Sequence, residues 1–470
     1  MAFLKTLVDI VGAAHVLQGQ DCAKYRADWT GLYEADPIAV IRPSTTQEVS
    51  SVVKACAAEE IPIVPVSGNT GLTGGTYAKG AVMISMERLN RIREIRADAR
   101  LAVVDAGVIL DQLRGAANAE GLLFPLSFGA RGSAMIGGVL STNAGGSNVL
   151  KYGSTRALCL GLEVVLPDGQ IMDLMSELHK DNSGYNLKDI MIGAEGTLGL
   201  ITGAVMKLFP MPRAYATAMV AVPKLDQALG LLNALQSKTG GMVEAFEHMP
   251  RSYVARHVDI IEGSKEPFED LYDVNILVEL GATSDRDAQP LADGSVPVVE
   301  LLQDTLAGMM ERDEILDAVV AQNDAQRTEM WKRREDAAEV VLTLRPLQNN
   351  DVCLPVDKVS AFLNAMKERL AVLDPDCIEM VVSHLGDGNV HYSLHPTRDR
   401  PELLSALMEA VEDEAIRLGG SFSAEHGIGL SKLPSMERRK DAVALSVMRA
   451  IKQTLDPKNL LNPGKVLPPA

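Results

Sequence analysis

Two histidines, His384 and His391, bracket a short turn in the sequence SHLGDGNVHYS, which covers residues 383–393. Apolar residues flank the turn on both sides, and this pattern predicts a β-hairpin. The Asp387-Gly388 pair suits a two-residue type I′ turn, which would place His384 directly opposite His391. Directly opposite side chains share one face, with Cβ atoms about 4.5–5.5 Å apart. Two imidazoles at that separation can share a metal ion, although an ordinary histidine pair in a hairpin has the same pattern.

A carboxylate that could complete such a metal site follows in SFSAEHGIG, residues 421–429. Glu425 is a suitable third ligand, and His426 beside it is a candidate general base. Adjacent residues of an extended segment point to opposite sides, so Glu425 can face a metal while His426 faces a substrate. Two imidazoles and one carboxylate leave an open coordination position, as catalytic zinc or manganese sites require. The alternative is a surface Glu-His pair without a ligand.

Three glycine-rich segments predict a second kind of ligand. They are PVSGNTGLTGG at 65–75, GSAMIGGVLSTNAGGSN at 132–148 and GYNLKDIMIGAEGTLGLIT at 184–202. Glycines let backbone N–H groups approach an anion such as a pyrophosphate closely. The first segment lacks GxGxxG spacing, and no GKS or GKT occurs in the chain, so NAD on a Rossmann fold and ATP on a Walker loop are disfavoured. The sequence predicts a different nucleotide-type cofactor.

An arginine pair, Arg333 and Arg334, stands in the helix-like stretch EMWKRREDAAE, residues 329–339. Most arginine pairs cover a solvated helix face. The functional interpretation is a planar guanidinium fork that holds a substrate carboxylate.

The bulk composition is that of an acidic globular protein. The chain has 470 residues, a formal net charge of −17, 47% hydrophobic residues and 23% charged residues. This length predicts about three domains, and the charge argues against nucleic acid or an anionic membrane as the main partner. The sequence contains no apolar run of the roughly 18 residues that a membrane span needs. Its five scattered cysteines form no CxxC pair, which argues against iron–sulfur clusters and disulfides and favours a cytoplasmic location.

The predicted pattern of secondary structure changes near Pro210 and Pro212. Before this point strands and helices alternate, including a helix with a capping box from Thr45 to Glu48. After it, helices and strands are typical of an α+β domain with an antiparallel sheet. The predicted domains are residues 1–212, 213–420 and 421–470.

Seven motifs together carry a resemblance to a known family. They are GNTGLTGG, IGGVLSTNAGG, KDNSGYNLKD, GAEGTLGLIT, HLGDGNVH, AEHGIG and LNPGKV. The chain resembles the FAD-linked oxidoreductases of the vanillyl-alcohol oxidase type, and among them the D-2-hydroxyacid dehydrogenase branch. The resemblance implies an α+β fold: a two-subdomain FAD-binding domain, an antiparallel-sheet substrate-binding cap and a C-terminal helical segment that completes the active site.

The resemblance also implies which residues line the cofactor. They are Val66, Ser67, Gly68, Asn69, Thr70, Gly71, Leu72, Pro125, Gly132, Ser133, Ile136, Gly137, Gly138, Ser141, Thr142, Asn143, Gly145, Gly146, Glu195, Gly196, Gly199, Ile201, Asn462 and Lys465. Relatives with covalent flavin often carry a histidine just after the glycine loop. Here the loop reads Asn69-Thr70-Gly71, so non-covalent FAD is expected.

For the chemistry, the resemblance implies that His384, His391 and Glu425 hold a divalent metal, with zinc expected first and manganese or iron as alternatives. His426 would be the catalytic base and Arg334 would hold the substrate carboxylate. The substrate site implied in this way consists of Arg334, His384, Asn349 and Lys465.

One departure concerns a second substrate carboxylate. The branch that oxidises hydroxyglutarate usually has a lysine where QNNDVCLP carries Asn349, and Cys353 replaces a serine. Ala338 replaces a threonine, and Arg345 is a possible substitute cation. D-2-hydroxyglutarate, D-lactate and D-malate therefore all stay open as substrates.

The resulting hypothesis is an FAD-dependent dehydrogenase that oxidises a small anionic D-2-hydroxy acid to the 2-keto acid, with hydride transfer to flavin N5. Electrons would leave to an external acceptor: an electron-transfer flavoprotein, a quinone or a cytochrome. The oligomeric state stays open, and a homodimer is one expectation. The alternatives are a flavin-free His/His/Glu metallohydrolase and a non-catalytic flavin-binding module.

Overall fold

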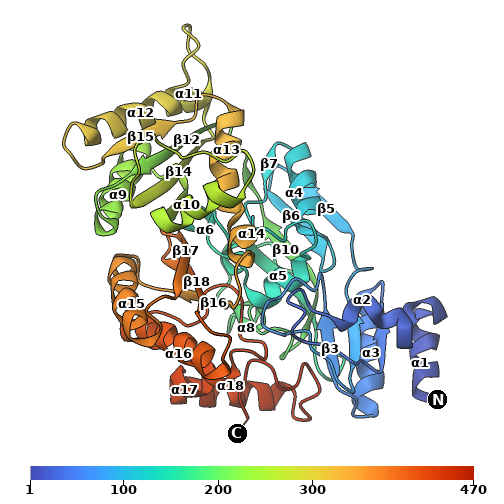
Figure 1. Cartoon of the computed structure of the whole chain (residues 1–470). Coiled ribbons are helices and arrows are strands. Elements are labelled where there is room, and N and C mark those ends of the chain that lie inside the picture. Colours follow the sequence, from blue (N-terminus) through green and yellow to red (C-terminus); the bar gives the residue numbers. More distant parts are fainter. Residues whose placement is uncertain (1, 470) are drawn as a thin grey trace. The chain divides into compact units, whose positions relative to one another are not determined.

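The computed structural model describes residues 2–469, and its chain forms two compact units. The first unit contains the residues up to Gly145, Gly153–Pro210 and the chain from Glu425 onward. The second contains Gly146–Tyr152 and Met211–Ala424. The short segment 146–152 thus leaves the first unit, to which its sequence neighbours belong. The residues from Glu425 onward, expected within a separate C-terminal segment, group with the first unit. Figure 1 labels the helices and strands along the chain.

The first unit begins with a four-stranded sheet in the order β1-β2-β4-β3. Its strands are β1 (Val16–Leu17), β2 (Ala39–Ile41), β3 (Ile63–Val66) and β4 (Val82–Ser85). Strand β4 pairs in parallel with β2 and β3, and helices α1 (Ala2–Val11) and α3 (Thr46–Ala58) share a buried apolar core with this sheet. The predicted cap of α3 is present: Thr45 Oγ1 accepts the Glu48 N–H at 3.1 Å, and Glu48 reaches back to the Ser44 N–H at 2.7 Å.

A five-stranded antiparallel sheet in the order β5-β6-β10-β8-β9 forms the rest of the first unit's framework. Its strands are β5 (Ile92–Arg96), β6 (Leu101–Asp105), β8 (Cys159–Val165), β9 (Ile171–Leu174) and β10 (Leu200–Lys207). A small pair joins β7 (Leu122–Leu123) to β11 (Phe209–Pro210). The remaining helices are α2 (Ala23–Arg26), α4 (Leu110–Ala119), α5 (Ile136–Thr142), α7 (Thr155–Leu158), α8 (Leu187–Met191), α17 (Leu433–Arg439) and α18 (Ala442–Leu455).

The second unit is built on a seven-stranded antiparallel sheet, as predicted, in the order β15-β12-β14-β13-β17-β18-β16. The strands are β12 (Ala214–Ala221), β13 (Val243–Pro250), β14 (Val274–Ala282), β15 (Asp317–Val320), β16 (Gln348–Cys353), β17 (Ile378–His384) and β18 (Asn389–His395). The helices are α6 (Val149–Tyr152), α9 (Ala228–Thr239), α10 (Arg251–Ile260), α11 (Asp285–Ala288), α12 (Pro297–Met310), α13 (Asp324–Glu335), α14 (Ala337–Leu342), α15 (Val359–Leu373) and α16 (Pro401–Arg417).

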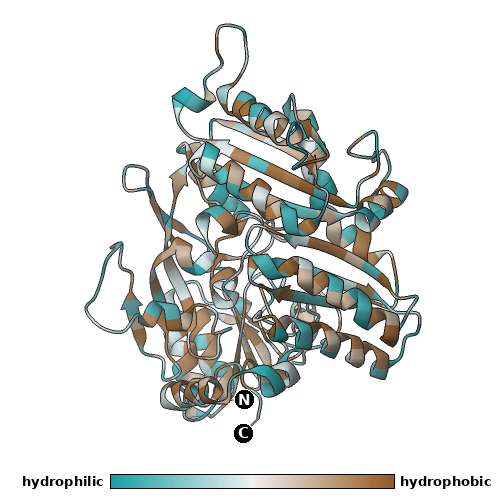
Figure 2. Cartoon of the chain, turned by 90° about the vertical axis from the view of Figure 1, so that its left-hand side faces the viewer, coloured by the Kyte–Doolittle hydropathy of each residue, from teal (hydrophilic) through white to brown (hydrophobic). Residues whose placement is uncertain are grey.

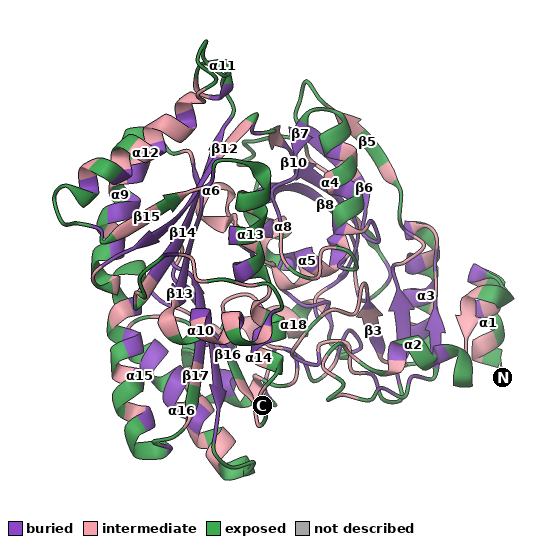
Figure 3. Ribbon diagram, turned by 45° about the horizontal axis from the view of Figure 1, so that its top comes forward, coloured by how far each residue is buried: buried purple, intermediate pink, exposed green. Residues whose placement is uncertain are grey.

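The two faces of this sheet carry different layers. Helices α9, α12, α15 and α16 bury their apolar sides in one large core, and α10, α13 and α14 contribute to a smaller core on the other face. Side chains alternate between these faces along each strand. Figure 2 shows helices with one hydrophobic and one hydrophilic side, and Figure 3 shows the sheet strands as mostly buried. The face with the smaller core carries the polar groups described below.

The hairpin of the two histidines has a different register from the predicted one. His384 pairs with Asn389, and His391 pairs with Val382, because four residues, 385–388, form the turn. The Asp387 and Gly388 N–H groups both donate to the His384 carbonyl, at 3.2 and 3.1 Å, so this turn replaces the two-residue type I′ turn. The register differs by two residues, which preserves the side-chain alternation. Both imidazoles therefore still lie on one face, as diagonal neighbours with ring centroids 5.3 Å apart.

His248 lies on the opposite face of β13 and makes the second unit sensitive to acid. It is 2% exposed, its Nδ1 has no hydrogen-bond partner among the described residues, and burial lowers its pKa to about 3. The unfolded chain takes up this proton near pH 6.5. The free energy of unfolding therefore carries no penalty from His248 above about pH 6.5, and it falls as the pH drops through that value.

We expect the His248→Leu variant to lose about 2 kcal/mol less stability than the wild type between about pH 7.5 and pH 5. Thermal unfolding followed across this range would show a fall in Tm that is smaller by about 4–8 °C. Parallel pH curves for the two proteins would rule out His248 as the titrating group.

Two further observations concern the whole described chain. No helix within residues 2–469 has the length and apolar character needed to cross a bilayer. The five cysteines, all of them described, are free thiols.

Candidate functional site

The first two glycine-rich segments meet in the first unit. A Cβ atom on Gly68 would lie 2.1 Å from the Ser133 carbonyl oxygen, and one on Gly138 would lie 3.2 Å from the Ser67 Cβ. Only glycine allows the 66–72 loop to approach residues 133–138 this closely. The third segment joins them because the Glu195 N–H donates to the Ser141 carbonyl at 2.8 Å. The structure thus brings together three segments that the sequence proposed as one cofactor site.

Glu195 holds the C-terminal part of the first unit against these segments. Its carboxylate accepts the N–H groups of Ile428 at 2.7 Å and Gly429 at 2.8 Å. Burial raises the pKa of Glu195, and the two N–H donors oppose that rise. The Asn462 side chain donates to the carbonyls of Glu195 at 2.8 Å and Gly75 at 3.0 Å. The AEHGIG and LNPGKV motifs are therefore fixed beside the glycine-rich segments.

Lys465 is a buried cation in this unit. It is 6% exposed, and its ammonium donates to the Pro463 carbonyl at 3.1 Å and lies 5.9 Å from the centre of the Tyr77 ring. Burial lowers the pKa of Lys465 to about 8. A buried ammonium without a carboxylate in these contacts favours a nearby anionic ligand.

Glu425 and His426 stand on the same C-terminal segment. A Cβ on Gly145 would lie 2.4 Å from Glu425 Oε1, so the Glu425 carboxylate lies beside the end of the second glycine-rich segment. The Thr73 hydroxyl donates to the His426 carbonyl at 3.3 Å. Gly427 then turns the chain with φ +75°, which explains the glycine after the two functional candidates.

In the second unit, Arg334, Glu247 and His384 form a buried polar cluster on the smaller-core face. Arg334 Nε donates to Glu247 Oε2 at 2.7 Å, and His384 Nδ1 lies 2.8 Å from the same oxygen. Burial would raise the pKa of Glu247, but His384 and Arg334 outweigh that effect and lower it. The Arg334 Nη2 also lies 3.3 Å from His384 Nε2. Glu247 therefore orients both a guanidinium and an imidazole.

His391 lies on the same face, beside Asp351 of β16. Its Nδ1 is 3.7 Å from Asp351 Oδ1, and the Asn389 amide donates to that oxygen at 2.8 Å. Asp351 is 1% exposed. Asn349, two residues earlier, is exposed and accepts a hydrogen bond from Ser393 Oγ at 2.9 Å. The strands thus place imidazole and carboxylate groups within one patch of the sheet.

Helix α10 fixes the part of α13 that carries Arg334. The buried Tyr253 hydroxyl donates to the Arg333 carbonyl at 2.6 Å. One turn later, His257 Nε2 lies 3.0 Å from Asp336 Oδ2. Arg334 is held between these two contacts, so its 8% exposed side chain has a defined direction.

Glu247 and Asp351 were not among the site residues predicted from the sequence. Glu247 was detectable, because an acid in the apolar strand VEAFEHMP is unusual at an inward position. Asp387 in the turn was named only as a turn residue, yet burial raises its pKa to about 6. These acids identify the histidine face as more polar than the motif alone indicated.

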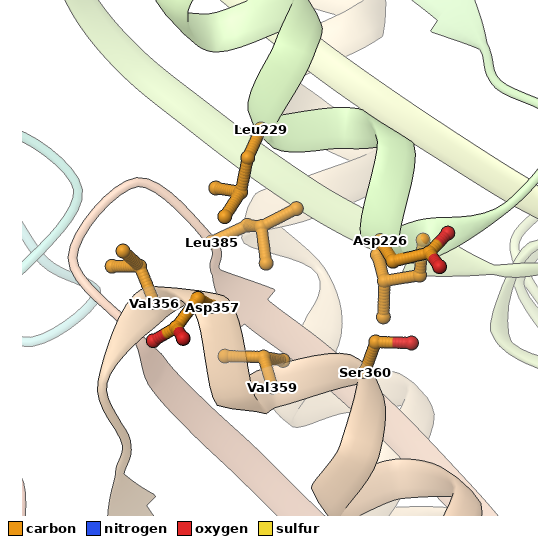
Figure 4. A pocket seen from close by; sticks show the side chains of 8 residues that line it. Asp226, Leu229, Val356, Asp357, Val359, Ser360 and Leu385 are labelled. Atoms are coloured by element: carbon orange, nitrogen blue, oxygen red, sulfur yellow. The ribbon is translucent and has the colours of Figure 1, made fainter.

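A small pocket lies on the other side of the histidine turn (Figure 4). It is lined by Leu225, Asp226, Leu229, Val356, Asp357, Val359, Ser360 and Leu385. Figure 4 shows Leu385, the first turn residue, pointing between Leu229 and Val359. This pocket anchors the turn and is separate from the face with His384.

The fold is shared with solved structures of low sequence identity. The chain aligns with p-cresol methylhydroxylase, crystallised with its substrate, at a TM-score of 0.74 and 16% identity, covering 99% of this chain and 96% of that one. It aligns with alkyldihydroxyacetonephosphate synthase at a TM-score of 0.73 and 17% identity, covering 99% and 86%. At these identities the likeness establishes the fold, which is the predicted one.

Family models match most of the chain. A model described as an FAD binding domain matches residues 37–175, and one described as the C-terminal domain of FAD linked oxidases matches residues 211–466. The chain therefore belongs to the FAD-linked oxidases and is an FAD-dependent oxidoreductase. This confirms the predicted family and argues against the flavin-free metallohydrolase.

Curated relatives extend along nearly the full chain. D-2-hydroxyglutarate dehydrogenase of Xanthomonas citri pv. viticola is 34% identical, covering 95% of this chain and 92% of the relative. The enzyme of that name from Stutzerimonas stutzeri is 33% identical, covering 98% and 97%. A putative mitochondrial D-lactate dehydrogenase of Schizosaccharomyces pombe is 32% identical, covering 95% and 84%. The chain accordingly falls in the predicted branch of the family, that of the D-2-hydroxyacid dehydrogenases.

Proposed function

We propose that this enzyme oxidises a small D-2-hydroxy acid to the corresponding 2-keto acid. The observation that carries the proposal is the buried cluster of Arg334, Glu247 and His384, with His391 on the same face of the sheet. A guanidinium beside two imidazoles is suited to an anionic substrate with a hydroxyl group. The names of the full-length relatives support the same substrate class.

The first unit fits FAD. The glycines at 68 and 138 let two of the proposed cofactor-binding segments pack closely where side chains would clash. The buried Lys465 ammonium can compensate an anionic group of the cofactor. When bound, FAD would supply the oxidant, a two-electron acceptor for the hydride of a hydroxy acid. The glycine-rich residues named from the sequence would line the cofactor without a covalent bond to it.

The second unit fits a divalent metal. His384 and His391 offer ring nitrogens from one face, and the Glu247 carboxylate fixes the His384 Nδ1 side so that Nε2 can serve as the ligand. This donor set suits zinc first, with manganese or iron as alternatives. A bound metal would act as a Lewis acid toward the substrate hydroxyl.

Glu425 is proposed as the third ligand from its place in the chain. The Ala424 N–H donates to the Asp351 carbonyl at 3.2 Å, and Glu425 is the next residue. The peptide bond between them therefore tethers Glu425 to the strand that pairs with β18, the strand of His391.

The reaction divides among the chain's own groups. Arg334 binds the substrate carboxylate through the part of its fork that Glu247 does not use. His426 accepts the proton of the substrate hydroxyl as the C2 hydride leaves, so two electrons and one proton leave with the hydride and a second proton goes to the base. Lys465 and Asn349 are the further proposed substrate contacts.

Reoxidation requires an external acceptor. An electron-transfer flavoprotein, a quinone or a cytochrome would take the two electrons from the reduced cofactor. A cytoplasmic location and a homodimer remain predictions from the sequence. The direct test is incubation with a D-2-hydroxy acid and an artificial electron acceptor, followed by chemical identification of the 2-keto acid. Acceptor reduction without any keto acid would reject the proposed reaction.

Metal binding should respond in a graded way to substitutions around the histidines. Glu247→Gln removes an outer-shell carboxylate and should weaken metal binding about 10- to 100-fold. His391→Ala removes a proposed ligand and should weaken metal binding further. Loss of a bond to the metal costs more affinity than loss of a group that only orients a ligand. Metal content per protein after dialysis against a chelator series measures both effects.

His395→Gln is the matched control, since His395 stands on the same strand and its Nδ1 lies 3.2 Å from the Pro346 carbonyl. It should retain the metal affinity of the wild type. Equal metal content in His391→Ala and the wild type would exclude His391 as a ligand.

A further inference from the structure

The segment 146–152 ties the second unit to the cofactor-lining part of the chain. It begins four residues after Thr142, the last residue of α5, and the chain returns to the first unit at Gly153. The two ends of this excursion are fastened together in the first unit. Thr155 donates to the Ala144 carbonyl through its N–H at 3.0 Å and its hydroxyl at 2.7 Å, and Arg156 N–H donates to Asn143 Oδ1 at 2.9 Å. These contacts hold residues 143–145 and 153–156, here called the neck, together at the C-terminal end of α5.

The far end of the excursion is clamped in the second unit by a buried carboxylate. Glu244 of β13 is 3% exposed and accepts from Lys151 Nζ at 3.0 Å and from the Tyr152 hydroxyl at 2.7 Å. Lys151 also donates to the Gly281 carbonyl at 3.4 Å. Removing Lys151 would leave a buried carboxylate without its cation, which is costly. The clamp therefore opposes detachment of this segment from β13.

Between neck and clamp, Leu150 packs on the turn that links the two histidines. A Cβ atom on Gly386 would lie 2.6 Å from Leu150 Cδ2. The Gly386 N–H donates to the Phe246 carbonyl at 3.2 Å, so the turn is held between β13 and Leu150. Leu385, the residue before it, is 1% exposed in the pocket of Figure 4. Within this turn, the Asp387 and Gly388 N–H groups hold the His384 carbonyl.

We propose that segment 146–152 couples FAD binding to the order of the histidine turn, with Leu150 as the positioning residue. This inference rests on the proposed placement of FAD along residues 132–146. Cofactor contact fixes α5 and the neck, and the seven-residue excursion transmits that position to Leu150 and then to Gly386. Because coupling is reciprocal, a disturbance at Gly386 must weaken FAD binding.

The test introduces a steric clash in one variant and removes it in a second. The measured quantity is the dissociation constant for FAD binding to the apoprotein. Gly386→Ala should push against Leu150 and weaken FAD binding about fivefold or more. Leu150→Ala/Gly386→Ala removes the clash and should return the constant to that of Leu150→Ala alone. Gly230→Ala is the matched control, because a Cβ there meets no atom within 4 Å in helix α9 of the same unit.

A wild-type FAD constant in Gly386→Ala, or a weakened one that the double variant does not relieve, would overturn the coupling. If Gly386→Ala does not fold, hydrogen exchange of residues 384–391 in wild type and Leu150→Ala decides. FAD should slow exchange of the turn in the wild type, and this effect should disappear in Leu150→Ala while FAD still binds. Equal protection in both contradicts the proposal. An enzyme that binds FAD but oxidises no hydroxy acid would contradict the proposed function and not the coupling.

Discussion

Replacing Arg334 by methionine should lower kcat/KM for the D-2-hydroxy acid about a thousandfold. The variant loses a pair of charge-assisted hydrogen bonds to the substrate carboxylate, together worth about 4 kcal/mol. FAD affinity should stay at the wild-type value, because Arg334 belongs to the second unit and its contacts are Glu247 and His384. Steady-state kinetics and an FAD titration of the same preparation measure the two quantities.

Arg327→Met is the matched control for this variant. Arg327 stands two turns earlier on α13 and makes a comparable bidentate pair with the buried Glu279, at 2.6 and 2.7 Å. It therefore reports the structural cost of removing an arginine from the same helix. We expect a lower Tm in both variants and a large loss of kcat/KM only in Arg334→Met. Equal kinetic losses in the two variants would contradict a substrate-binding role for Arg334.

Replacing His426 by alanine should slow flavin reduction about 10²- to 10⁴-fold, the usual contribution of a positioned general base. The His426 backbone, which accepts a hydrogen bond from Thr73, remains in the variant, so the segment should keep its place. Binding of FAD and of the hydroxy acid should change little. Anaerobic rapid mixing with substrate gives the rate of flavin reduction directly.

His179→Ala is a suitable control, because His179 is an exposed histidine of the first unit. It should reduce flavin at the wild-type rate. A high activity of His426→Ala at elevated pH would further support the base assignment, since solvent hydroxide can then take the proton. Wild-type flavin reduction in His426→Ala near neutral pH would remove His426 from this role.

Local chemistry was sufficient to predict the elements that frame the site. The Thr45–Glu48 capping box predicted the start of α3. The Thr45 hydroxyl oxygen and the Glu48 N–H that it accepts are only three residues apart. The antiparallel sheet of the second unit was predicted as part of an α+β domain. The interactions that decide the cap lie close together in the sequence.

The histidine hairpin shows the limit of that reasoning. The Asp387-Gly388 dipeptide favours a two-residue turn, yet the turn has four residues. Leu385 is buried in the apolar pocket and Gly386 lies under Leu150, and neither contact is visible from the hairpin's own sequence. The common face of His384 and His391 survived because the register changed by an even number of residues.

The pairing of these acids with the histidines was the other part that could not be predicted from the sequence. Glu247 lies 137 residues from His384 in the chain, and only strand pairing between β13 and β17 brings them together. Asp351 reaches His391 in the same way, through pairing of β16 with β18. Motif spacing describes neighbours along the chain, whereas these partners are set by the strand order of the sheet.

The most direct test of the account is anaerobic mixing of the FAD-loaded enzyme with D-lactate, D-malate and D-2-hydroxyglutarate in turn, with L-lactate as the control. The visible absorption band of the oxidised flavin reports the outcome, because hydride transfer bleaches it. We predict that at least one D-hydroxy acid bleaches the band, that L-lactate does not, and that chelator treatment abolishes the effect. A protein that binds FAD but is bleached by none of the D-hydroxy acids would contradict the proposed function.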